Sequence, residues 1–88
     1  MFTLNYQDVD GTPYSVAKTK TRDGEFDVWI VIDHETETVT AVAIPPLREG
    51  EHIDMLPWEM VDDKAWEAIK SDIELYADHF GYRVERYL

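Results

Sequence analysis

The first residues of the chain carry the pattern of a β-hairpin. Apolar and polar side chains alternate over residues 2–7, which is the period of a strand with one buried face. Asp10-Gly11 suits a tight turn because both residues tolerate positive φ. Tyr14, Val16 and the threonines that follow indicate the returning strand.

A second hairpin is predicted immediately afterwards. Asp23-Gly24 turns the chain into residues 26–32, where β-branched and aromatic residues occupy both parities from Val28 onward. Both faces of this strand are therefore expected to be buried, which makes it the central strand of the sheet. Polar residues 33–37 form the loop, and residues 38–44 form the next strand, which Pro45-Pro46 ends.

The period becomes helical from Asp62 onward. Apolar side chains separated by three or four residues fall on one helical face. They are Trp66, Ile69, Ile73, Tyr76 and Phe80. Asp62 can cap the start of a helix that runs to Phe80, and Gly81 suits the left-handed residue that closes its end. Residues 82–87 then read as a short last strand.

These elements predict an α+β fold in a single domain, residues 1–88. An antiparallel sheet of about four to five strands, made of a meander of two hairpins plus a short C-terminal strand, would be covered on one face by the long amphipathic helix. A chain of 88 residues has room for only one compact unit.

Residues 47–61 have no clean period and contain Gly50 and Pro57, which predicts a long loop with one short helical turn near residues 57–60. Loops of this length are uncommon in compact domains and are often functional. Function is therefore expected to be more sensitive here than in the first hairpin. Trp58 has two interpretations, a core plug under the loop or an exposed anchor of an interface.

The charge of the chain is strongly acidic and unevenly distributed. Nineteen acidic residues against eight basic ones give a net charge of −11, and residues 23–63 contain twelve acids with Arg48 as their one base. Such a surface disfavours direct contact with nucleic acid and favours a basic partner. The candidate partner-binding residues are Asp33, Glu35, Glu37, Glu49, Glu51, Asp54, Trp58, Glu59, Asp62 and Asp63.

No residue pattern predicts catalysis, a metal site or a cofactor. The chain has no cysteine, and His34, His52 and His79 lack ligand spacing, so all three are interpreted as solvated surface side chains. Ser15 and Ser71 have no nearby sequence cue for activation. We therefore expect a protein that is not an enzyme.

Lys18, Lys20 and Arg22 form the one basic row in the first half of the chain. A solvated row that protects a sheet edge is a simpler interpretation than a contact with nucleic acid. An uncovered sheet edge is equally compatible with a homodimer.

The leading functional hypothesis is a small inhibitor or adaptor that docks an acidic surface on a basic protein, in its strongest form by imitating the phosphates of a nucleic acid. In size and charge balance the chain is similar to mobile-element proteins, phage anti-CRISPR and anti-restriction proteins among them, that block host nucleases. The alternatives are an immunity protein or antitoxin that neutralises a cognate toxin, and a non-catalytic structural or small-ligand module. No segment suggests a membrane span or a leader, so the cytoplasm, or the host cytoplasm for a phage protein, is the expected compartment.

Overall fold

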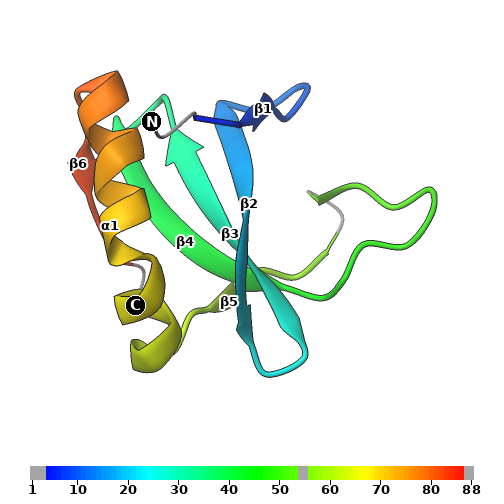
Figure 1. Ribbon diagram of the computed structural model, residues 1–88. Helices are drawn as coiled ribbons and strands as arrows, with labels where there is room; N and C mark the ends of the chain where they lie inside the picture. The colour runs from blue at the N-terminus through cyan, green and yellow to red at the C-terminus, as the bar shows by residue number, and fades with distance from the viewer. Residues whose placement is uncertain (1–3, 54–55, 87–88) are drawn as a thin grey trace.

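The fold is a sheet covered by a helix on one face and by a long loop on the other (Figure 1). The computed structural model describes residues 4–53 and 56–86. In chain order the elements are β1 (Gln7–Asp8), β2 (Tyr14–Asp23), β3 (Phe26–Asp33), β4 (Thr38–Ile44), β5 (Glu59–Met60), α1 (Asp63–Phe80) and β6 (Arg83–Val84).

Strands β1 to β5 follow one another across the sheet in an antiparallel meander. Strand β6 pairs in parallel with β4, next to the short β5 on the same edge. The predicted α+β class, the two hairpins and the single helix are confirmed. Residues 27–33 of β3 are buried throughout, which confirms its predicted central place.

The helix begins and ends where its capping residues stand. The Asp62 carboxylate accepts the Ala65 N–H at 2.8 Å, and Gly81 adopts the left-handed conformation with φ 73°. Asp62 supplies a hydrogen-bond acceptor that the first helical turn lacks, and Gly81 supplies the backbone conformation that ends the last turn. The predicted extent of the helix is thus confirmed to within one residue.

The core has two layers because strands β3 and β4 are apolar on both faces. On the helix side, Val28, Ile30 and Ile32 of β3 belong to one cluster with the helical stripe, in which Ile69 and Ile73 are fully buried. The loop side is a separate cluster of Val16, Trp29, Val31, Val42, Ile44 and Ile53, with Val9, Tyr14, Leu56 and Trp58 packed against it.

The long loop therefore has a packing role. Its Ile53 is buried against the sheet, and the indole N–H of Trp58 donates to the Ile53 carbonyl at 2.9 Å. The Trp58 ring also lies 5.6 Å from that of Tyr14. Of the two interpretations of Trp58, the geometry of the folded chain favours the core plug.

Two local predictions are wrong. The helical turn expected near residues 57–60 is absent, because Glu59 and Met60 pair with Ala43 and Val42 as strand β5. Hydrogen bonding to the unpaired backbone groups on the edge of β4 stabilises this segment as a strand and outweighs its local propensity for a turn.

The first strand is also shorter than its alternation predicts, since pairing with β2 covers only Gln7 and Asp8. Leu4 packs on the helix-side core, and the Tyr6 ring meets that of Phe80 at 5.2 Å. The alternation before Gln7 therefore reflects packing on the helix instead of sheet pairing. Phe2 lies outside the described residues.

The helix stripe makes a direct stability prediction. Replacing Ile73 by Ala should lower the free energy of unfolding by about 2–5 kcal/mol, because it removes a fully buried side chain and leaves a cavity. Leu75, two residues away and 41% exposed, is the matched control, and Leu75→Ala should change stability by less than about 1 kcal/mol. Urea unfolding of both variants measures the difference, and equal losses would contradict this packing.

Candidate functional site

The predicted acidic residues lie in three separate places. Asp33 ends β3, and Glu35 and Glu37 lie in the turn that follows it. Glu49 and Glu51 belong to the long loop, and Glu59, Asp62 and Asp63 to the approach to the helix. Asp54 lies outside the described residues. The eight described acidic residues therefore do not form one continuous patch, and each group has its own geometry.

In the turn between β3 and β4, one carboxylate is structural and two are exposed. Asp33 is buried and accepts the backbone N–H groups of Glu35 at 2.9 Å and Thr36 at 3.3 Å. Glu37 adopts a positive φ of 56°, which reverses the chain into β4. Asp33 thus holds the turn, while the exposed Glu35 and Glu37 carry charge outward.

Carboxylates at the start of the helix are tied into local contacts. The Asp62 backbone N–H donates to the Asp23 carboxylate at 2.9 Å, and Asp63 forms an ion pair with Arg86 at 2.7 Å. The Ala65 N–H that donates to Asp62 lowers the pKa of this carboxyl below its usual 3.8, and its hydrogen bond with Asp23 adds to the lowering.

The long loop and the first hairpin meet around one hollow of about 580 Å³. We call it the acidic hollow, and it is lined by Gln7, Asp8, Val9, Asp10, Leu47, Glu51, His52 and Ile53. Two acidic residues, Asp10 of the hairpin and Glu51 of the loop, line it together with the exposed Leu47, whereas the Asp8 carboxylate accepts the buried Ser15 hydroxyl. Of the predicted site residues, Glu51 lines this hollow.

The backbone of the rim is ordered by short-range bonds. The Glu51 carboxylate accepts the Arg48 N–H at 2.9 Å, and the Glu51 N–H donates to the Arg48 carbonyl at 3.0 Å. Gly50 completes this tight turn with φ 85°. Asp8 and Asp10 were missed from the sequence because no local pattern indicates that the hairpin and the loop meet.

His34 is not the solvated side chain that its loop position predicts. Its ring nitrogens lie 2.8 Å from the Ser15 hydroxyl and 2.9 Å from the Tyr82 hydroxyl, and its ring packs 5.2 Å from that of Phe80. Because the Ser15 hydroxyl donates to Asp8 at 2.6 Å, four side chains form one hydrogen-bonded chain. This chain ties the first hairpin to the segment after the helix.

The contact between Ser15 and His34 resembles a nucleophile with its base, but two features oppose that role. Ser15 is fully buried, so no substrate reaches its oxygen in this conformation. Its proton is also directed at Asp8, whereas an activated serine donates to the histidine. Among the described residues there is also no cluster of three or more side chains suited to hold a metal ion.

A scan of protein-family models, a search of curated proteins and a search of solved structures each found no match to this chain. In the part of the chain that the structure describes, no helix is long and apolar enough to cross a membrane.

The cap at Asp62 predicts a pH dependence of stability. Because folding lowers the pKa of this carboxyl, its contribution is present above its usual value of 3.8 and is lost as the pH falls through the lower folded value. Asp62→Ala should therefore lower the thermal midpoint near neutral pH, and its difference from the wild type should shrink in acid.

Asp62→Asn is the control, because asparagine keeps an oxygen that can accept the Ala65 N–H but does not titrate in this range. It should stay close to the wild type near neutral pH. Thermal unfolding followed by circular dichroism across the acid range measures all three proteins, and an Ala-variant difference that does not change with pH would contradict this role of Asp62.

Proposed function

We propose that the protein binds a basic surface of another protein and that the acidic hollow receives a lysine or arginine side chain of that partner. The observation that carries the proposal is the meeting of Asp10 and Glu51 around a single concave site. A cationic side chain entering this site would find carboxylate acceptors, and charge-assisted hydrogen bonds are the stronger kind.

The hollow also suits the apolar stem of such a side chain. Val9 is half-buried in its wall, and Leu47 is 39% exposed beside it. Lysine and arginine bury their methylene groups against apolar surface while their charged ends reach polar groups. The combination of an apolar wall with carboxylates fits a long basic side chain better than a small cation.

The walls are held before any partner arrives. The hairpin wall is paired to β2 through Gln7 and Asp8, and the loop wall is anchored by buried Ile53. A site ordered in advance loses less conformational entropy on binding. This supports a binding role for the loop in addition to its packing role.

The charge of the whole chain narrows the class of partner. A net charge of −11 attracts basic proteins over a long range and repels nucleic acid. Surfaces that bind nucleic acid are rich in Lys and Arg, so a nuclease or another nucleic-acid-binding protein is the partner class that we propose, with the carboxylates in the place of phosphates. In this role the protein is an inhibitor or adaptor and not an enzyme, and the lack of cysteine is compatible with the cytoplasm.

The proposal predicts that charge reversal in the hollow weakens binding. A basic partner is first captured from lysate on the immobilised wild-type protein, and dissociation constants are then measured for variants. Asp10→Lys with Glu51→Lys should raise the dissociation constant more than about tenfold, since like charges would meet the partner's cations.

Glu67→Lys with Glu74→Lys is the matched control, because it makes the same change in net charge on exposed positions of the helix. This control should raise the dissociation constant by less than about threefold, as expected for long-range charge alone. Equal weakening by the two pairs, with both proteins folded, would leave the hollow without a role.

The rate of association should also depend on salt. Because most of the negative charge lies between residues 23 and 63, we expect steering of the partner by a field that is screened beyond about 8 Å at physiological ionic strength. Stopped-flow or surface-plasmon measurements should show the association rate falling as salt rises while dissociation changes less. An association rate indifferent to salt would exclude steering by the acidic surface.

A further inference from the structure

The outer edge of strand β2 is the one long strand edge that the described residues leave without a partner strand. β2 spans Tyr14–Asp23, but β1 pairs only with Ser15 and Val16. An uncovered edge of this length normally invites pairing with another chain. Whether this edge is open or closed therefore decides whether a second copy can add to the sheet.

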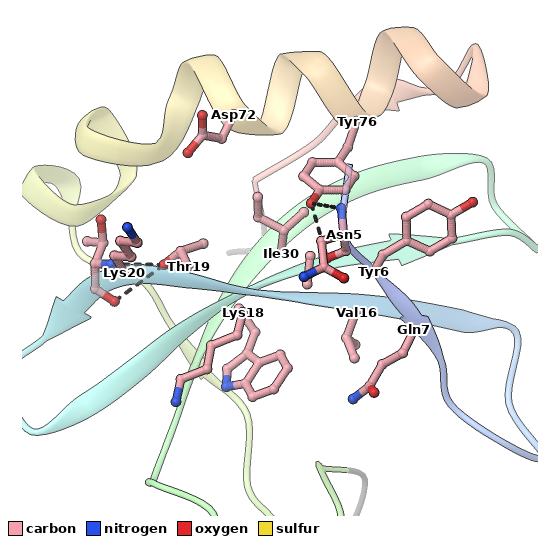
Figure 2. Close-up of a pocket in the computed structure, with 13 residues that line it drawn as sticks. Asn5, Tyr6, Gln7, Val16, Lys18, Thr19, Lys20, Ile30, Asp72 and Tyr76 are labelled. Carbon is pink, nitrogen blue, oxygen red and sulfur yellow. Dashed lines mark hydrogen bonds between the residues drawn. The ribbon is translucent and has the colours of Figure 1, made fainter. Parts of the chain in front are cut away.

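The segment before β1 does not pair with this edge. Continuing the register of Gln7 with Val16 would place Asn5 opposite Lys18. Instead the Asn5 N–H donates to the Tyr76 hydroxyl at 3.2 Å, and that hydroxyl donates to the Asn5 carbonyl at 3.4 Å. Figure 2 shows Asn5 directed at Tyr76 of the helix, which leaves a hollow of about 490 Å³ between this segment and β2.

A large bulge interrupts the exposed edge. Lys18 pairs with Trp29 and Arg22 with Asp27, so the three residues 19–21 lie opposite Val28 alone. The Thr19 hydroxyl holds this shape by donating to the Val28 carbonyl at 2.9 Å and accepting the Thr21 N–H at 3.1 Å. A bulged strand bends and twists, so an incoming strand loses its register there.

Cations line the same stretch. Lys18 and Arg22 each lie 3.4 Å from the Asp27 carboxylate, and Lys20 has no ion pair among the described residues. A second copy pairing antiparallel at this edge would place these cations against their own counterparts. Lysines and bulges on an edge are the features by which sheet proteins prevent association through strands.

We infer that the β2 edge is closed to strand addition chiefly by the bulge at residues 19–21, with the adjacent cations as a secondary barrier, so that the protein is a monomer although most of this strand is uncovered. The inference is independent of the partner proposed above, because it concerns the basic edge of β2 and not the acidic hollow. It predicts that removing the bulge, and not merely a charge, opens the edge to a second copy.

Deletion of Lys20 and Thr21 tests this directly. It leaves Thr19 alone opposite Val28 and keeps Lys18, Arg22 and Asp27 in register, so β2 becomes regular without loss of the ion pairs. The matched control, Lys20→Thr, loses the same charge and keeps the bulge. In sedimentation equilibrium, the mass of the deletion variant should rise with concentration to about twice that of the monomer, while the wild type and Lys20→Thr stay monomeric.

A folded deletion variant that remains monomeric, or a wild-type protein that dimerises through β2, would overturn the inference. Amide hydrogen exchange of the wild type provides a readout that does not depend on the deletion variant folding. The backbone groups of alternate residues in a strand point to the same edge. Those of Tyr14 and Val16 point toward β1, because the Val9 N–H donates to the Tyr14 carbonyl and Gln7 pairs with Val16. The N–H of Lys18 therefore points to the uncovered part of the same edge. Its exchange should be fast and unaffected by protein concentration, and protection that grows with concentration would show that the edge is open.

Discussion

The burial of both faces of β3 is the constraint on which the rest of the structure depends. Val28, Ile30 and Ile32 point to one face, and Trp29 and Val31 point to the other. A strand of this kind is stable only when each face is covered, because exposed apolar surface costs free energy in water. Since α1 is the only helix among the described residues and covers one face, a segment that is not helical covers the second face.

The long loop performs that task, and this changes what its length means. A loop of this size is often kept for function, yet here Ile53, Leu56 and Trp58 pack against the sheet. Its length is therefore explained by packing, and its charged residues are the part that packing leaves unexplained. Glu51 lies on the rim because the same segment that buries Ile53 passes beside the first hairpin.

Polar contacts connect the ends of these layers. The chain from Asp8 through Ser15 and His34 to Tyr82 joins the hairpin to the segment after the helix. Arg86 connects the segment after β6 to the start of the helix, since it donates to the Val61 carbonyl at 2.8 Å and lies over the ring of Trp66. The buried Ser15 hydroxyl and the His34 ring are tolerated in this small core because each has hydrogen-bond partners.

The sequence by itself determined the elements whose signals are local. The period of the helix, its caps at Asp62 and Gly81, the turns at Asp10-Gly11 and Asp23-Gly24, and the double-faced burial of β3 all follow from residues close together in the chain. Such features depend on backbone preference and on periodicity, which a reader of the sequence sees directly.

Tertiary structure alone decided the contacts between distant segments. The pairing of Glu59 and Met60 with β4, the partners of His34 and the meeting of Asp10 with Glu51 have no local signal. In each case a backbone edge, a buried polar group or an apolar face acquires its partner from a segment many residues away. The residue types along the chain specify that such partners are needed, whereas the packing of the layers selects which segment supplies them.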